Sequence, residues 1–369
     1  MKKNNIKIFI SITTALLLGT LIPEAVNAKP MEFKLIPPNQ PVELFGNAWQ
    51  IFADGELDSK SAEKLQKLID KNKIPDRSRI YLSSLGGSLV GGIELGKVIR
   101  KNGLFTNVGK LQGIKEENKI KGVTWKEPLI SPSNCMSACV LSYMGGSFRF
   151  LIKNSDLGVH RFYSGSRFMD SDAAQITSSY VLQYISSMGV DDSIFHEMVK
   201  AGKDEINILP RTVSNKLNLV NEGYSNTSWT LQSINGGIYV KGERDTWRGV
   251  NKFLTACDTS TKKLFQTFIF DTEGRDQDLA KMQSVSIFTN SKTIPIEKYM
   301  WSKALIANNT LTAYMTLPTD LLVTLINSES IGVAFQYAHD APFFLGFEGM
   351  NLSEGKDKLE NIIKLCKNN

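Results

Sequence analysis

Three short segments of this chain hold the residues best suited to chemistry: a double glycine at Gly86-Gly87, a serine at Ser137 and a histidine at His160. A serine becomes a nucleophile when a neighbouring histidine takes its proton. Backbone N–H groups, such as those of a glycine turn, can stabilise the oxyanion that forms when that serine attacks a carbonyl. The order of the three segments therefore predicts an acyl-transfer site.

Each of these residues also has a purely structural interpretation. A serine that begins a helix often caps it, a single histidine is more often a satisfied core residue than a base, and a double glycine is commonly a tight turn. Ser137 lies between Met136 and Ala138 at a predicted helix start, so the capping role stays open. The three features together favour the catalytic interpretation.

Alternating strands and helices between residues 47 and 220 are expected to position these segments. The pattern is typical of an α/β fold in which βαβ units build a parallel sheet. A polar segment that contains Trp125 interrupts it, and this segment is predicted to be a solvated loop, with a flap over the site as the alternative. The elements expected are strands at 48–53, 79–83, 104–108 and 149–152, helices at 58–72, 89–101, 138–144, 172–188 and 191–201, and the loop at 110–133.

Residues 45–222 resemble the Clp protease proteolytic subunit and its crotonase-type superfamily, in the exported form carried by bacterial periplasmic proteins. The resemblance rests on the strand and glycine turn at 80–88 with Gly91-Gly92, on the nucleophile turn at 135–138, and on Val159-His160. It implies a spiral core of αββ units with a serine-peptidase site that hydrolyses peptide bonds.

The resemblance and the chemistry together assign a role to each residue. Ser137 is expected to attack the substrate carbonyl, and His160 to take its proton and return it to the leaving group. The oxyanion is expected between the backbone N–H groups of Gly87 and Ala138. A glycine at position 87 lets the backbone approach a substrate without a Cβ atom in the way.

The acid of the triad matches the family less closely. In the Clp subunit an aspartate orients the histidine from the segment before the last short helix of the core, and Ile206 falls at or near that position. We favour Asp204 as the acid, with Glu205 and Asn207 as the alternatives. If none of them reaches His160, the site is a Ser–His dyad or a degenerate site that binds peptide without cutting it.

The first 28 residues have the pattern of a secretory signal peptide. A lysine-rich start precedes an apolar run at 8–22, and Val26-Asn27-Ala28 matches the small-x-small cleavage pattern. The apolar run is short for a bilayer span, although an uncleaved anchor is the alternative. We therefore expect a protein that is exported to the periplasm, or secreted, in a bacterium, with no integral membrane span.

Composition and charge exclude several classes of partner. The chain of 369 residues is 42% hydrophobic and 22% charged, and its formal charge of +6 comes from lysines scattered among acidic residues. Without a basic stripe, nucleic-acid binding is not expected. The three histidines are scattered, so we expect no metal, and no cofactor. The expected partner is a peptide or unfolded protein substrate, and the sequence is compatible with a homo-oligomer.

Residues 225–369 change to short β-rich runs separated by turns. This pattern predicts a small, mainly antiparallel β domain that ends in a helix, following a Clp protease-like domain at 29–224. No catalytic constellation occurs in it, so a binding or interaction module is expected. The β-rich runs lie at 229–234, 237–240, 264–270, 285–288 and 311–317.

The four cysteines form two groups. Cys257 and Cys366 both lie in the β-rich domain, and export makes a disulfide between them the expected pairing. Cys135 and Cys139 lie on either side of Ser137, and residues four apart on a helix are near the upper limit of disulfide geometry. The sequence leaves that second pair open.

Two classes of function follow from these observations. The first is a periplasmic serine peptidase that uses Ser137 and His160. The second is a catalytically degenerate platform that binds peptides or partner proteins through the C-terminal domain. Crotonase-type acyl-CoA chemistry is a distant third, because an exported protein meets little CoA.

Overall fold

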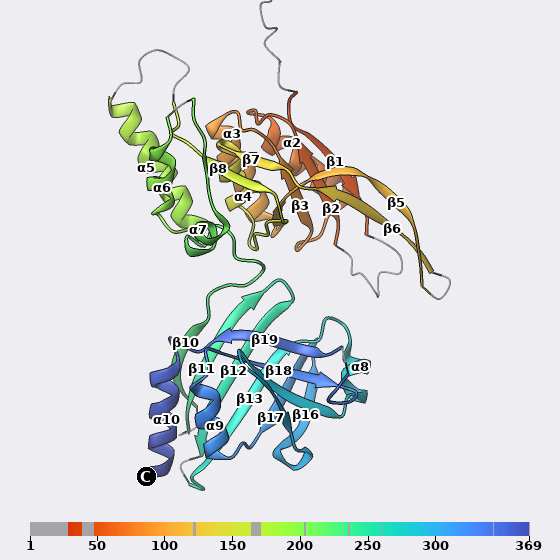
Figure 1. Ribbon diagram of the computed structural model, residues 1–369, viewed down its shortest axis with the longest axis vertical. Coiled ribbons are helices and arrows are strands. Elements are labelled where there is room, and N and C mark those ends of the chain that lie inside the picture. The colour runs from red at the N-terminus through yellow and green to blue at the C-terminus, as the bar shows by residue number, and fades with distance from the viewer. Residues whose placement is uncertain are drawn as a thin grey trace, which may run out of the picture.

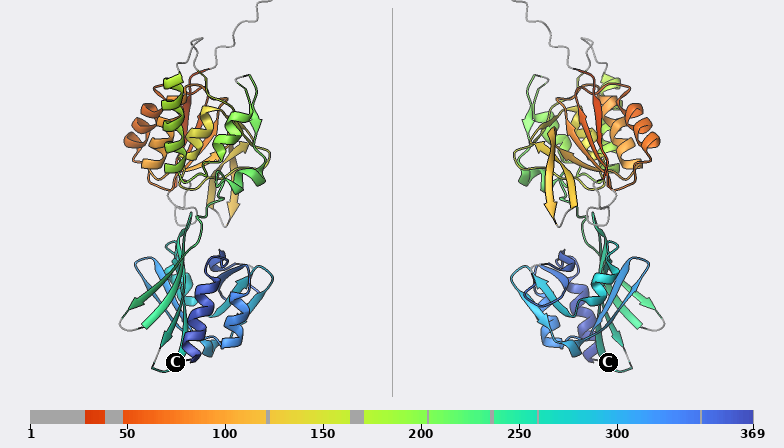
Figure 2. Two further views of the ribbon diagram at one scale, coloured as in Figure 1. Left: turned by 90° about the vertical axis from the view of Figure 1, so that its left-hand side faces the viewer. Right: turned by 90° about the vertical axis from the view of Figure 1, so that its right-hand side faces the viewer.

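The computed structural model describes residues 29–38, 48–120, 123–163, 171–202, 204–234, 237–258, 260–341 and 343–368. The expected signal peptide at 1–28 lies outside these ranges. The described chain has a mixed α/β fold, as predicted, and Figures 1 and 2 show two lobes joined by a narrow connection. Each lobe has its own hydrophobic core. One core takes its residues from between Met31 and Val220, and the other from between Trp229 and Cys366.

A four-stranded sheet forms the base of the first lobe. Its strand order is β1-β2-β3-β4, with β2, β3 and β4 parallel and β1 antiparallel at the edge. Two helices, α2 and α3, connect the parallel strands, as βαβ units require. The bounds are β1 (Glu32–Ile36), β2 (Gln50–Asp54), α2 (Ser61–Asn72), β3 (Arg79–Ser83), α3 (Leu89–Lys101) and β4 (Phe105–Val108).

Glycines of α3 let it pack closely against a second helix, α4 (Ala138–Met144). A Cβ atom added to Gly92 would lie 2.4 Å from the carbonyl oxygen of Ala138, and one added to Gly96 would lie 2.8 Å from that of Leu141. Larger side chains at these positions would push the helices apart. The glycines of α3 therefore bring the start of α4 close to the glycine turn that precedes α3.

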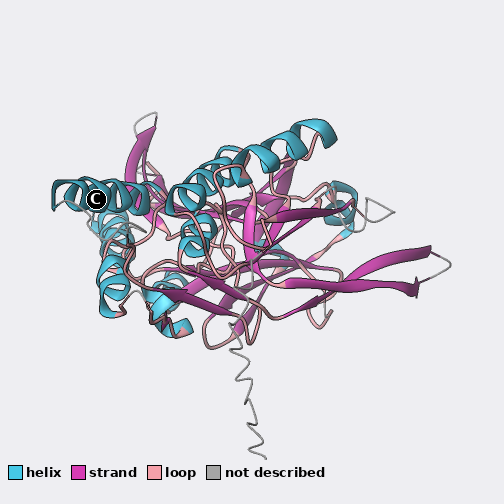
Figure 3. Ribbon diagram, turned by 90° about the horizontal axis from the view of Figure 1, so that it is seen from above, coloured by secondary structure: helices cyan, strands magenta, loops and turns pink. Residues whose placement is uncertain are grey.

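The segment predicted as a loop or flap at 110–133 is instead a long antiparallel hairpin. Its strands β5 (Lys110–Ile120) and β6 (Val123–Ser131) pair with each other alone and extend away from the sheet, as Figures 1 and 3 show. At its base Leu111 and Ile130 pack against a small core cluster, whereas the mostly polar sequence beyond them does not alternate. The polar sequence of this segment therefore concealed its strands.

A second, small sheet carries the candidate site. It consists of β7 (Asn134–Met136), β8 (Asp156–Val159) and β9 (Asn207–Ile208), with β7 and β8 parallel. Two backbone hydrogen bonds join it to the end of β3: Ser84 donates to Asn134, and Met136 donates to Ser84, each at 2.9 Å. The nucleophile strand and the glycine turn are thereby fixed to each other.

The strand predicted at 149–152 is reduced to one isolated bridge between Thr106 and Arg149. Arg149 is 2% exposed, and its guanidinium donates to backbone carbonyls at the ends of three segments: Gly146, Met188 and Leu219. Burial lowers the pKa of this guanidinium to about 10. These contacts tie the carboxyl end of α4 to the helices that follow, α5 (Ser171–Ser187), α6 (Ile194–Lys200) and α7 (Arg211–Lys216).

The second lobe contains two antiparallel sheets. A six-stranded sheet has the order β10-β11-β12-β13-β17-β16, and a four-stranded sheet has the order β15-β14-β18-β19. The Cys257–Cys366 disulfide joins β12 to the last helix, α10 (Lys356–Asn368). The remaining bounds are β10 (Ser228–Ile234), β11 (Gly237–Thr246), β12 (Gly249–Asp258), β13 (Lys263–Asp271), α8 (Asp276–Lys281), β14 (Ser284–Thr289), β15 (Thr293–Ile296), η1 (Lys298–Met300), β16 (Trp301–Ala307), β17 (Thr310–Met315), α9 (Thr319–Ile326), β18 (Ser330–Gln336) and β19 (Leu345–Asn351).

Candidate active site

Ser137 occupies a sharp turn between a strand and a helix. β7 ends at Met136 and α4 begins at Ala138, so a single residue reverses the course of the chain. The backbone φ of Ser137 is +56°, in the region that favours glycine, which costs about 1–3 kcal/mol for other residues. This strand–serine–helix turn has the form of a nucleophile elbow.

The serine does not act as a helix cap. Ser137 is at the N-cap position of α4, but its side chain makes no capping hydrogen bond. Instead, its Oγ lies 2.7 Å from Nε2 of His160. The structural alternative for Ser137 is therefore not realised, and the hydroxyl is directed to the imidazole.

The two parallel strands β7 and β8 bring Ser137 and His160 together. Met136 pairs with Gly158 across the sheet, and the N–H of Ser137 donates to the Gly158 carbonyl at 2.8 Å. His160 follows the end of β8, so its ring reaches the serine from the neighbouring strand. Both side chains are half-buried, which leaves the pair accessible to a substrate.

The glycine turn lies directly against the serine. A Cβ atom added to Gly86 would be 2.8 Å from Cβ and 3.3 Å from Oγ of Ser137. Leu57 donates to the carbonyl of Gly86 and accepts from the N–H of Ser88, which directs the N–H of Gly87 away from Leu57. The sequence identified Gly87, but not the contact that requires Gly86.

The two expected oxyanion donors are open. Among the described residues, neither the N–H of Gly87 nor that of Ala138 donates to a backbone carbonyl. Gly87 is exposed and has a φ of +128°, so only a glycine fits this turn without strain. Both N–H groups are thus without a backbone acceptor, and Ala138 itself is buried.

The predicted acid does not reach the imidazole. Nδ1 of His160 is buried and has no hydrogen-bond partner in the described part of the chain. Glu205 accepts from the N–H of Gly202, and the Asn207 amide donates to Glu197. Asp204 is exposed and does not bond Nδ1 either. The structure therefore joins Ser137 to His160, and no hydrogen bond links Asp204 to Nδ1 of that ring.

The bare Nδ1 atom has a consequence for the tautomer of His160. A base must have its proton on Nδ1, so that Nε2 can accept from the serine. Either tautomer leaves Nδ1 unsatisfied, as a donor without an acceptor or as an acceptor without a donor, and each costs about 1–3 kcal/mol. An acceptor at Nδ1 would decide between the two.

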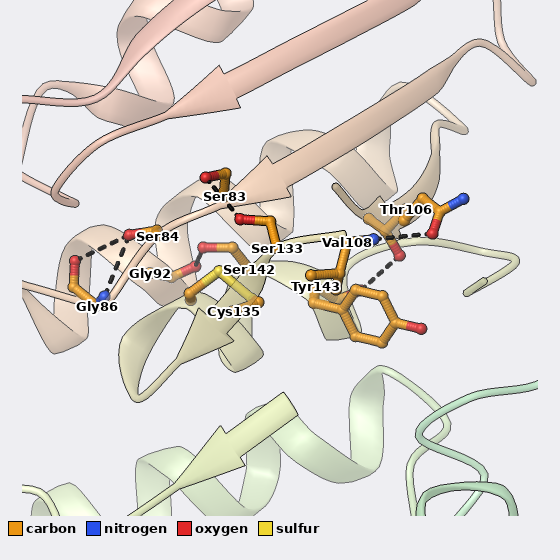
Figure 4. The surroundings of a disulfide bond; sticks show 12 residues. Ser83, Ser84, Gly86, Gly92, Thr106, Val108, Ser133, Cys135, Ser142 and Tyr143 are labelled. Atoms are coloured by element: carbon orange, nitrogen blue, oxygen red, sulfur yellow. Dashed lines mark hydrogen bonds between the residues drawn. A yellow bond between two sulfur atoms is a disulfide. The ribbon is translucent and has the colours of Figure 1, made fainter. Parts of the chain in front are cut away.

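The disulfide that the sequence left open is present. Cys135, at the centre of β7, is bonded to Cys139, in the first turn of α4, and Ser137 lies midway between them. Both cysteines are fully buried. Figure 4 shows this bond beside the Ser84–Gly86 hydrogen bonds of the glycine turn and the Ser142–Gly92 bond between α4 and α3.

Two apolar side chains near the site are exposed to solvent. Leu85, next to Gly86, is 77% exposed, and Ile208 of β9 is 44% exposed. Met136 and Ile206 approach Gly158 so closely that a Cβ atom there would lie 2.3 and 2.5 Å from their side chains. Sequence reasoning missed both the exposed apolar side chains and the close contacts at Gly158.

Neither a membrane-spanning helix nor a metal cluster occurs in the described ranges. No helix in them is both long and apolar enough to cross a bilayer. Within the same ranges, no group of three or more His, Cys, Asp or Glu side chains is arranged to hold a metal ion.

Comparisons with known proteins find similarity among solved structures. No family model matches this chain, and no curated protein matches its sequence. Among solved structures, the chain is similar to a point mutant of ClpP1 from Listeria monocytogenes, with 15% sequence identity and a TM-score of 0.34. The match covers 47% of this chain and 88% of that one.

Proposed function

We propose that this protein is a Clp-like serine peptidase that hydrolyses peptide bonds through Ser137 and His160. The observation that carries the proposal is the 2.7 Å contact between Ser137 Oγ and His160 Nε2 at a turn with positive φ. A strained serine that neither caps its helix nor packs in a core has no structural reason to be there. Residues 29–224 would form the catalytic domain, with the spiral of αββ units as part of the proposal.

The reaction would follow the usual course of acyl transfer. Ser137 Oγ attacks the peptide carbonyl while Nε2 of His160 takes its proton, and the imidazolium then protonates the leaving amine. Water then attacks the acyl group while His160 takes its proton. The imidazolium returns that proton to Ser137 Oγ as the acid product leaves. The open N–H groups of Gly87 and Ala138 support their role as donors to the oxyanion.

The surroundings of the site support an extended peptide as the substrate. Leu85 and Ile208 present apolar side chains to solvent on elements adjoining the serine and the histidine. Such side chains can bury a substrate residue that an unfolded protein exposes. Export to the periplasm is part of the proposal, and the two disulfides are compatible with an oxidising compartment.

One observation favours a second function. Because Nδ1 of His160 has no acceptor among the described residues, the imidazole is not held in the basic tautomer. A degenerate site of this kind would bind peptide without cutting it, and the C-terminal module at 225–369 would then recognise the partner. The same experiment distinguishes the two functions.

The experiment is labelling by a fluorophosphonate probe, which reacts only with an activated serine. Wild-type protein is expected to be labelled, and Ser137→Ala protein is expected not to be. Ser142→Ala is the matched control, because Ser142 lies on the same helix and donates to Gly92 away from the site. Absence of labelling in folded wild-type protein would reject the peptidase and leave the binding platform.

A further inference from the structure

The disulfide beside the nucleophile closes a loop that has Ser137 at its centre. The bond from Cys135 to Cys139 spans four positions of the sequence, and it links the strand before the turn to the helix after it. Ser137 has a positive φ although it is not glycine. Something must hold this conformation, because a serine prefers another one.

The flanking elements are short, and they are held by packing and by hydrogen bonds to neighbouring segments rather than by their own length. β7 has three residues and α4 has seven, and helices of that length are marginal on their own. The backbone bond from Ser137 to Gly158 fixes one side of the turn. The disulfide fixes both sides at once, because it joins the two residues that flank Met136-Ser137-Ala138.

We infer that the Cys135–Cys139 disulfide is a positioning device for the nucleophile, and that catalysis by Ser137 depends on it. Without the bond, Ser137 would relax toward negative φ and its Oγ would leave Nε2 of His160. This inference rests on the proposed function. It adds a redox requirement: the enzyme is competent only where the bridge persists, in an oxidising compartment.

A role in global stability is the competing explanation. Closing a short loop removes less entropy from the unfolded chain than closing a long one. Cys257–Cys366 spans 109 positions, so that bond is expected to contribute more to the free energy of unfolding. The two disulfides thus provide a matched pair, one at the nucleophile and one remote from it.

The test compares two double variants of the full-length protein. Cys135→Ala/Cys139→Ala is expected to lower the maximal rate of fluorophosphonate labelling by about 100-fold, the effect of a small misplacement of reacting atoms. The half-saturating concentration of the probe should change by less than about threefold, because the site is misaligned rather than removed. Cys257→Ala/Cys366→Ala should be labelled at the wild-type rate.

A spectroscopic signal separates positioning from loss of structure. The imidazole resonances of His160 in Cys135→Ala/Cys139→Ala protein should move toward those of Ser137→Ala protein, because both lose the contact with Oγ. A wild-type labelling rate, or wild-type imidazole resonances of His160, in folded Cys135→Ala/Cys139→Ala protein would overturn the inference. If wild-type protein itself were not labelled, the proposed function would fail instead.

A second measurement covers the case in which the alanine variant does not fold. In Cys257→Ala/Cys366→Ala protein, the disulfide left for an added dithiol reagent to reduce is Cys135–Cys139. The reagent supplies two electrons and two protons, the S–S bond becomes two thiols, and the reagent becomes its own disulfide. Alkylation verifies reduction. Labelling should fall after reduction and return after reoxidation, and unchanged labelling of the reduced protein would reject the inference.

Discussion

Gly86 lies in contact with Ser137, and no larger residue fits between them. A Cβ atom on Gly86 would lie 2.8 Å from the Ser137 Cβ, and the φ of Gly86 is +113°. The glycine turn therefore restrains the position of Ser137, in addition to leaving the Gly87 N–H without a backbone acceptor. It limits how far the nucleophile can move toward the turn.

Gly86→Ala is predicted to reduce labelling of Ser137 by at least about 100-fold, because the new methyl group displaces the serine from the histidine. The control is Gly113→Ala in the hairpin, where a Cβ atom would meet nothing within 4 Å. Labelling rates of the two variants provide the measurement. Equal rates would show that the turn has room that the geometry does not indicate.

Asp204→Asn is predicted to change the labelling rate by less than about threefold, whereas loss of the acid in a working triad lowers kcat by about 10⁴-fold. The reason is that Nδ1 of His160 has no partner among the described residues. Glu205→Gln and Asn207→Ala serve as parallel variants. A large fall for any one of them would identify the residue that moves onto the imidazole when substrate binds.

Alkaline conditions are predicted to destabilise the first lobe through two buried tyrosines. Burial raises the pKa of Tyr143 and Tyr184 well above the usual 10.0. Above about pH 10, these two tyrosines lose their protons in the unfolded chain but keep them in the folded protein. The stability that these groups contribute below about pH 10 is then lost as pH rises, by up to about 1.4 kcal/mol per pH unit and tyrosine.

Urea unfolding between about pH 8 and about pH 10.5 checks this prediction. Tyr184→Phe and Tyr143→Phe should each flatten the alkaline loss of stability, although each removes a hydrogen bond to a backbone carbonyl. Tyr299→Phe is the control, because that side chain is 81% exposed. Identical pH slopes in all three variants and the wild type would refute the assignment.

Removal of the Cys257–Cys366 bond is predicted to lower the stability of the second lobe by about 4–5 kcal/mol in the chain-entropy model. The bond ties the last helix, α10, to β12, and both cysteines are buried. Denaturation of Cys257→Ala/Cys366→Ala protein, followed by the fluorescence of Trp229 in that core, measures the loss. Stability equal to wild type would mean that packing alone holds the helix.

The regular elements of the first lobe could be predicted because apolar runs and helix-period segments alternate there and end at glycines or polar turns. The strand at Arg79–Ser83 and the helices at Leu89–Lys101 and Ala138–Met144 have the predicted bounds. The hairpin was missed because its mostly polar sequence does not alternate. In the second lobe, strands β12 and β18 were missed for want of a turn signal or of alternation, since β18 is buried on both faces.

The candidate site was only partly visible in the sequence. Ser137 and His160 could be paired because their flanking residues form recognisable strand ends. The contact between Gly86 and the serine depends on how β3 meets β7, which no local pattern encodes. The partner of Nδ1 depends on the path of the chain around β9, so spacing alone did not identify an acid that reaches His160.

The hairpin between β4 and β7 also affects how the site assembles. Lys110 and Ser131 pair at its base, so once it forms, the chain entering the nucleophile strand starts from a point already close to the end of β4. A hairpin is a local structure that closes in microseconds, and loop-closure entropy grows with the length that remains free. The hairpin thereby shortens the free chain that must close before Cys135 can pair with Ser84. Substitutions that weaken it should slow folding while leaving the finished site unchanged.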